Sequence, residues 1–205
     1  MNKPHLYTNP QSRGRIVRWM LEEIGAPYDV TVMAYGETMK SSQYLQINPM
    51  GKVPALVHGN AIVTETAAIC AYLAEAFPEA ELGPKPSERA AYLRWLFFAA
   101  GPLESAITNQ SMGFLPNEKQ QGFAGYGNFT LVQDVLENAI SQTPYITGER
   151  FTAADVYIGS QIGWGLQFNL LEKREAFIRY WEKLSKRPAH LKATELDDAL
   201  IKAKG

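Results

Sequence analysis

Hydrophobic positions in the first 77 residues change their period along the chain, from every second residue to every third or fourth. Apolar side chains recur at helical spacing over residues 16–24, and Gly25 ends that helix. From Tyr28 to Val32, apolar side chains alternate with polar or smaller ones, which is typical of a strand. With a short strand at residues 5–7 and a helix at residues 65–77, the pattern predicts the element order β-α-β-α-β-β-α.

The pattern changes after a short segment rich in residues that break helices and strands. Gly83-Pro84-Lys85-Pro86 indicates a linker, and no convincing alternation of period two follows residue 87. Two long apolar segments, 89–107 and 129–140, predict helices instead. A stretch with four glycines and a proline, 113–128, is expected to be an exposed and mobile loop.

These patterns predict two domains of different class. We expect an α+β domain over residues 1–78, a linker over 79–87 and an all-helical bundle domain over 88–205. Thr152 and Asp155 form a capping box at the start of one helix of the second domain, and Phe151 and Val156 can form its hydrophobic staple. We interpret this box as a folding element.

Composition excludes several classes of function. The chain has 205 residues, 46% of them hydrophobic, and a net charge of −1, so neither nucleic acid nor an anionic membrane is an expected partner. No apolar run approaches the roughly 20 residues that span a bilayer, and the first residues lack the apolar stretch of a secretory signal. A single cysteine, Cys70, excludes an intrachain disulfide and is expected to pack in an apolar helix. The three histidines show no metal-ligand spacing, so no metal is expected, and the predicted setting is soluble and cytoplasmic.

The most informative segment is Asn48-Pro49-Met50-Gly51-Lys52-Val53-Pro54-Ala55-Leu56. Pro54 stands at the mouth of a predicted strand, where proline is unfavourable because it cannot donate to a ladder of hydrogen bonds. Its position indicates either a sheet edge or a cis Val53–Pro54 bond. A cis bond would leave the Val53 N–H and C=O groups free to pair with an extended, peptide-like ligand. Gly59-Asn60 then predicts the two-residue turn of a β-hairpin.

Glu65 and Thr66 follow that hairpin at the start of the next predicted helix. A helix N-terminus offers free N–H groups and a positive dipole potential, so it can hold a carboxylate. We therefore expect a site for a small peptide, whose backbone lies along Val53 and whose amino-acid end lies at Glu65 and Thr66.

This combination of residues resembles that of the cytosolic glutathione S-transferases, over essentially the whole chain. In that family a valine before a cis-proline pairs with the cysteinyl backbone of glutathione, and an acidic or amide residue followed by Ser or Thr holds the γ-glutamyl end. The matching positions are Val53, Pro54, Glu65 and Thr66, with threonine in place of the commoner serine. The resemblance implies a thioredoxin-like first domain, a second domain that lines the pocket for an electrophile, glutathione as co-substrate, and a homodimer.

Conjugation to glutathione requires its thiolate, whereas a cysteine-type thiol with a pKa of about 8.5 is only slightly ionised near neutral pH. A hydroxyl that donates to the sulfur lowers that pKa, and so does a nearby helix N-terminus. Ser12 meets both requirements, because it lies between the first strand and the first helix. It also stands five residues after Tyr7, which is the spacing in bacterial-like serine- and cysteine-type members of the family. Ser12 can equally be the N-cap of the helix.

Two other residues remain candidates for the same role. Tyrosine-type members use a tyrosine at the end of the first strand, where Tyr7 stands, although Tyr7 can also be a packing residue of that strand. Asn9 is a third candidate, since an amide can donate to sulfur.

Lys52 is expected to meet the glycine carboxylate of glutathione, or else to be solvated. The residues that line the acceptor pocket are less well defined by the sequence, and the candidates are Met112, Phe114, Tyr157 and Trp164. We expect a detoxifying transferase that conjugates glutathione to small apolar electrophiles. The alternatives are a glutathione-dependent peroxidase or disulfide reductase, and a non-catalytic protein that binds glutathione and apolar ligands.

Overall fold

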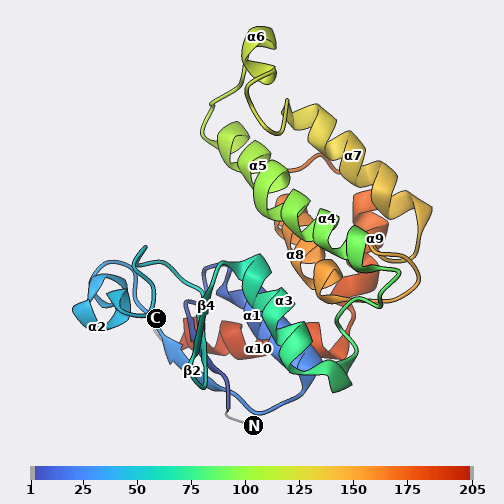
Figure 1. The fold of residues 1–205 in the computed structure, drawn as a ribbon. Helices are drawn as coiled ribbons and strands as arrows, with labels where there is room; N and C mark the ends of the chain where they lie inside the picture. Colours follow the sequence, from blue (N-terminus) through green and yellow to red (C-terminus); the bar gives the residue numbers. More distant parts are fainter. Residues whose placement is uncertain (1–2, 204–205) are drawn as a thin grey trace. The chain divides into compact units, whose positions relative to one another are not determined.

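The computed structural model describes residues 3–203, and its contacts divide the chain into two compact units (Figure 1). The first unit comprises Met1–Gly83 together with Arg187–Gly205, and the second comprises Pro84–Lys186.

Within the described part of the first unit, four strands form a mixed sheet with the order β2-β1-β3-β4. Strand β1 (His5–Thr8) pairs in parallel with β2 (Asp29–Val32) and antiparallel with β3 (Ala55–His58), and β3 forms a hairpin with β4 (Ala61–Thr64). Three helices complete the predicted order, namely α1 (Gly14–Ile24), the short α2 (Ser42–Leu45) and α3 (Thr66–Ala76). The thioredoxin-like fold expected from the sequence is confirmed.

Apolar layers cover both faces of this sheet. Leu6 and Leu56 lie opposite each other on β1 and β3, have no exposed surface, and belong to the face that α1 and α3 cover. Tyr7 and Ala55 lie opposite each other on the other face. There they pack against a cluster from the segment between β2 and β3, which includes Met33, Met39 and Tyr44. Both sides of β1 are therefore held in place, which fixes the point at which the chain leaves this strand.

The last helix, α10 (Pro188–Lys202), belongs to the first unit and packs along α1. The sequence pattern predicts an all-helical domain over 88–205 that includes this segment, but the structure places the segment in the first unit. The preceding helix ends at Ser185, before Pro188, and Pro188 occupies the first position of α10, where a missing N–H costs nothing. The contacts of α10 are with residues about 180 positions earlier in the chain, and the local pattern carries no record of them.

The second unit is helical, as expected. Its first helix, α4 (Arg89–Phe98), continues through a π turn (Ala99–Leu103) into α5 (Glu104–Ser111). Pro102 lies in that turn and cannot donate a backbone hydrogen bond, which accounts for the interruption of the predicted continuous helix. Helix α7 (Phe129–Gln142) runs back antiparallel to α5 (Figure 1).

Helix α8 (Ala153–Gln167) is buried along most of its length and forms the centre of the second unit, and α9 (Glu175–Ser185) packs against it. The predicted capping box is confirmed, because the Asp155 carboxylate accepts the Thr152 N–H at 2.8 Å. The glycine-rich stretch is largely exposed, but it also contains a short helix, α6 (Glu118–Gln121), with a capping box of its own. Over residues 3–203, no helix combines the length and the hydrophobicity needed to cross a membrane.

Candidate functional site

The register of the sheet brings three loop segments of the first unit to one edge. Tyr7, near the end of β1, lies opposite Ala55 at the start of β3, and Ala55 lies opposite Thr64 at the end of β4. The loop after β1, the segment before β3 and the start of α3 therefore meet at the same end of the sheet. These segments carry the predicted site residues Ser12, Lys52, Val53, Pro54, Glu65 and Thr66.

The Val53–Pro54 peptide bond is cis, which is one of the two arrangements predicted for Pro54, the other being a sheet edge. Neither the N–H nor the C=O group of Val53 hydrogen-bonds to a residue in the described range. The preceding carbonyl is held firmly instead, because the Lys52 oxygen accepts the Tyr44 hydroxyl at 2.6 Å and the Asn48 amide at 2.8 Å. The free main-chain groups of Val53 therefore sit on a rigid support.

Tyr44 and Asn48 are the supporting residues that sequence reasoning missed. Burial raises the pKa of Tyr44 to about 12, so its phenol stays protonated as a donor. Asn48 is 4% exposed, and its side-chain oxygen also accepts the Met50 N–H at 3.1 Å, which shapes the turn before Val53. The position of Asn48 before a proline is a turn signal, whereas nothing in the sequence around Tyr44 points to its role.

Glu65 has a strained backbone, with φ 65° and ψ 118°. A left-handed conformation at a residue other than glycine costs on the order of 1–3 kcal/mol and occurs most often at functional sites. The Glu65 side chain is exposed and does not cap α3, so both its carboxylate and the first N–H groups of the helix remain available. Thr66 is the first residue of α3 and is 7% exposed. This helix start therefore offers a carboxylate, a hydroxyl and several N–H donors in one place.

Ser12 lies in the tight loop between β1 and α1 and is half-buried. Its hydroxyl donates to the Asn9 carbonyl at 2.7 Å and accepts the Gly14 N–H at 3.0 Å. The N-cap of α1 is Arg13 and not Ser12, so the prediction of Ser12 as the cap is wrong by one residue. The Ser12 hydroxyl still satisfies one N–H of the first turn, that of Gly14. To donate to a ligand sulfur, the hydroxyl must exchange its bond with the Asn9 carbonyl for one with the ligand.

A close approach between β1 and α1 fixes this loop. A Cβ atom on Gly14 would lie only 1.9 Å from Thr8 Oγ1 and 3.1 Å from Ser12 Oγ. Thr8 has no exposed surface, and its hydroxyl has no hydrogen-bond partner in the described chain. Only glycine therefore fits between the strand and the serine.

Asn9 and Tyr7 differ in how far their polar groups are already engaged. Asn9 is 5% exposed, donates to the Met33 carbonyl at 2.7 Å and accepts the Gln11 N–H at 2.9 Å, so its amide mainly holds the loop together. Tyr7 is half-buried and its ring stacks on that of His5, with the ring centroids 4.5 Å apart. The Tyr7 hydroxyl has no hydrogen-bond partner within residues 3–203, so it remains available as a donor.

Arg15 links the loop between β1 and α1 to helix α10. Arg15 donates to the Pro10 carbonyl at 3.2 Å through Nη1 and to Asp198 Oδ1 at 2.8 Å through Nη2.

Lys52 is exposed, which suits either of the roles expected for it. Cys70 is fully buried in α3, and burial raises the pKa of its thiol to about 12, so it is a packing residue.

The four residues predicted to line an acceptor pocket all belong to the second unit. Tyr157 is 4% exposed and Trp164 is half-buried on α8, whereas Met112 and Phe114 are 55% and 65% exposed after α5.

Comparisons with known proteins follow the same division of the chain. Residues 3–75 match the family model described as the N-terminal domain of glutathione S-transferases. Glutathione S-transferase F10 of Arabidopsis thaliana is 30% identical over 169 residues, which cover 73% of this chain and 76% of that protein.

Solved structures extend the similarity to both units. A glutathione transferase from Methylococcus capsulatus has a TM-score of 0.78 and 27% identity, over 96% of this chain and 99% of that one. The glutathione transferase URE2P6 from Phanerochaete chrysosporium, solved in complex with oxidized glutathione, also has a TM-score of 0.78, with 26% identity over 97% of each chain.

Proposed function

The chain belongs to the glutathione S-transferase family, and from this premise we propose that it ionises the thiol of glutathione and transfers it to small apolar electrophiles. The observation that carries the proposal is the meeting, at one edge of the sheet, of a hydroxyl, a pair of unpaired main-chain groups and an uncapped helix N-terminus. These groups match the thiol, the backbone and the γ-glutamyl end of a tripeptide.

Glutathione would be held along its length. Its cysteinyl N–H and C=O groups pair with the free groups of Val53, as an added strand pairs with a sheet edge. Its γ-glutamyl carboxylate accepts the Thr66 hydroxyl and the first N–H groups of α3, and its ammonium group meets the Glu65 carboxylate. Lys52 meets the glycine carboxylate. The strained backbone of Glu65 suits this role, since it keeps the carboxylate off its own helix.

Thiol activation is assigned to Ser12. A hydrogen bond to a charged group contributes about 1.5–3 kcal/mol, which corresponds to a thiol midpoint roughly one to two pH units below that of a free cysteine-type thiol. The positive end of the α1 dipole acts in the same direction. The net stabilisation of the thiolate is smaller by the free energy of the hydrogen bond that the Ser12 hydroxyl loses with the Asn9 carbonyl. The Asn9 carbonyl is still hydrogen-bonded after that loss, because it also accepts the Ser12 N–H at 3.1 Å.

The chemical step is a displacement or an addition at carbon. In both cases a lone pair of the thiolate forms the new C–S bond. In a displacement, the bond to the leaving group breaks and the leaving group departs with its electrons. In an addition, the π bond breaks, and its electrons pass to the adjacent carbon or oxygen, which then takes a proton from water. Most of the rate gain comes from ionising the thiol and from placing it next to the electrophile. Assembly as a homodimer and a cytoplasmic role in detoxification accompany this proposal, on the strength of the family.

One observation favours a second candidate, a protein that holds glutathione without activating it. The Ser12 hydroxyl already donates to the Asn9 carbonyl at 2.7 Å. If this bond is stronger than a bond from the same hydroxyl to the glutathione sulfur, Ser12 does not stabilise the thiolate. If the thiol is activated even so, the remaining donor is the Tyr7 hydroxyl.

Conjugation of glutathione to 1-chloro-2,4-dinitrobenzene tests the proposal, with Ser12→Ala and Tyr7→Phe assayed beside the unmodified protein. We expect clear activity that falls roughly tenfold or more in Ser12→Ala, because about 1.4 kcal/mol of lost stabilisation corresponds to a factor of ten. Tyr7→Phe should retain its rate. Loss of the rate in Tyr7→Phe alone would move the role to Tyr7. Binding of glutathione without turnover, in all three proteins, would favour the second candidate.

A further inference from the structure

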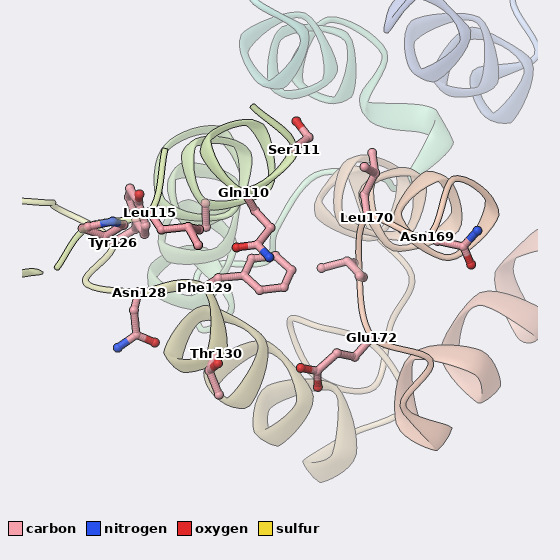
Figure 2. A pocket seen from close by; sticks show the side chains of 13 residues that line it. Gln110, Ser111, Leu115, Tyr126, Asn128, Phe129, Thr130, Asn169, Leu170 and Glu172 are labelled. Atoms are coloured by element: carbon pink, nitrogen blue, oxygen red, sulfur yellow. The ribbon is translucent and has the colours of Figure 1, made fainter. Parts of the chain in front are cut away.

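The second unit contains a pocket of about 710 Å³ (Figure 2). All of the residues that line it belong to the second unit. It opens between the last turn of α5, the first turn of α7 and the segment 169–172 that follows α8. Its volume lies within the range of about 300–1,000 Å³ that is typical of small-molecule sites.

The floor of this pocket is apolar. Ala106 and Leu171 are 1% and 4% exposed and form its buried base, and Phe129 and Leu170 are half-buried at its sides. Figure 2 shows the Phe129 ring between the Gln110 side chain, which lies above it in this view, and Glu172, which lies below. Leu115, which is 61% exposed, adds an apolar side chain on the α5 side. The space therefore suits the flat or branched hydrocarbon body of a ligand.

The mouth of the pocket carries polar groups with unused hydrogen-bonding capacity. The side-chain amides of Gln110 and Asn169 are exposed and make no hydrogen bond within the described part of the chain. Glu172 uses one oxygen, since its Oε2 accepts Arg174 Nε at 2.9 Å, and its side chain is 54% exposed. Two amide oxygens and a carboxylate oxygen are thus available as acceptors.

The charge at this mouth is negative. None of the thirteen lining residues is a lysine, arginine or histidine, and Glu172 is the sole charged residue among them. Its partner Arg174 is shared with Asp134 at 2.7 Å and Glu137 at 2.9 Å, so one guanidinium faces three carboxylates. Lys173 is exposed beside Glu172 in the chain but does not line the pocket. The balance of charge around the lining therefore favours a cation over an anion.

We propose that this pocket binds amphiphilic organic cations, with an aromatic or branched apolar body on Phe129 and Leu171 and a protonated amine directed to Glu172. The amide oxygens of Gln110 and Asn169 accept the remaining amine hydrogens. This pocket shares no residue with the predicted glutathione site or with the four residues predicted to line the acceptor pocket.

Three probes with the same ring and different charge test the proposal. Titration calorimetry with 1-naphthylmethylamine, 1-naphthylmethanol and 1-naphthylacetate, in the absence of glutathione, should give the tightest binding for the amine and the weakest for the acetate. In Glu172→Gln, the affinity for the amine should fall roughly two- to fivefold, the range for an exposed charge pair, while the affinity for the alcohol stays unchanged. Glu175→Gln is the matched control, since Glu175 is an exposed carboxylate outside the lining, and it should leave all three affinities unchanged.

Two further experiments test where the amine binds and whether a positive charge at the mouth of the pocket prevents its binding. Amide resonances of the ¹⁵N-labelled protein should shift on addition of the amine at residues 106–116, 126–130 and 169–172. Gln110→Arg places a cation at the mouth, on the last turn of α5 where the helix dipole tolerates it, and should reduce binding of the amine more than that of the alcohol. The proposal is overturned if the acetate binds as tightly as the amine, if Glu172→Gln and Glu175→Gln behave alike, or if the shifted resonances lie elsewhere.

Discussion

Replacing Asp197 by alanine breaks an ion pair that joins α1 to α10 in the interior of the first unit. Arg18 Nε donates to Asp197 Oδ1 at 2.7 Å, and the two side chains are 5% and 0% exposed. Without Asp197, the guanidinium remains buried, and its one remaining side-chain partner among residues 3–203 is the Tyr28 hydroxyl at 3.4 Å. Removing one partner of a buried pair costs about 3–5 kcal/mol. That cost is a large share of the roughly 5–15 kcal/mol by which native proteins are stable.

Urea unfolding measures this loss, with two comparison variants. Asp198→Ala removes the neighbouring carboxylate, whose side chain is 48% exposed in its pair with Arg15, and should cost about 1 kcal/mol or less. The double variant Arg18→Met/Asp197→Leu replaces the pair by apolar side chains and should recover most of the stability lost in Asp197→Ala. The reasoning is refuted if Asp197→Ala loses less than about 1 kcal/mol, or if the double variant is no more stable than the single one.

The same carboxyl group predicts a dependence of stability on pH. Burial raises the pKa of Asp197 above its ordinary value, against the opposing effect of Arg18. The folded protein therefore holds this proton more tightly than the unfolded chain does. The contribution of Asp197 to stability is fully present below a pH of about 4, the unfolded-state value, and decreases as the pH rises through the folded-state pKa. Urea unfolding between pH 4 and 7 should show this slope together with that of Asp155, whose pKa burial also raises, so Asp197→Asn should reduce the slope without abolishing it.

Three further predictions concern the first unit. Gly14→Ala brings a Cβ to within 1.9 Å of Thr8 Oγ1, so it should lower the free energy of unfolding by about 1–3 kcal/mol and displace Ser12, and an unchanged urea midpoint would contradict the close approach. Glu65→Gly and Glu65→Ala should both weaken glutathione binding about tenfold, as the loss of a charged partner does. Because Glu65 has a φ of 65°, the glycine variant should be about 1 kcal/mol more stable than the alanine variant, and equal stability of the two would count against backbone strain. Cys70 should not react with Ellman's reagent at pH 8 until the protein is denatured, because burial raises the pKa of its thiol to about 12, and rapid reaction of the folded protein would show that the α3 core opens.

Local patterns were sufficient for most of the fold. The alternation in Tyr28 to Val32, the Gly59-Asn60 turn and the Thr152 capping box each depend on neighbours within a few residues, and each structure formed where the sequence predicted it. For the proline at the mouth of β3, the local pattern left a sheet edge and a cis bond open, and the structure has the cis bond.

Interactions between distant segments could not be predicted in this way. The assignment of α10 to the first unit depends on pairs such as Arg18–Asp197, whose members are 179 residues apart and resemble ordinary surface charges in the sequence. The roles of Tyr44 and Asn48 depend on where the Lys52 carbonyl lies in space. The hydrogen bond from the Ser12 hydroxyl to the Asn9 carbonyl also depends on the geometry of the loop, which the sequence does not show. The strength of this bond determines how much free energy Ser12 loses when it donates to a ligand instead.

The most direct test of the proposed function is the ultraviolet absorbance of the thiolate of bound glutathione, followed against pH for the unmodified protein and for Ser12→Ala. The account predicts a midpoint about one to two pH units below the value near 8.5 of a free cysteine-type thiol, and its return toward that value in Ser12→Ala. Tight binding of glutathione with an unshifted midpoint in the unmodified protein would contradict activation by Ser12, and the protein would then be a binder of glutathione and not a transferase.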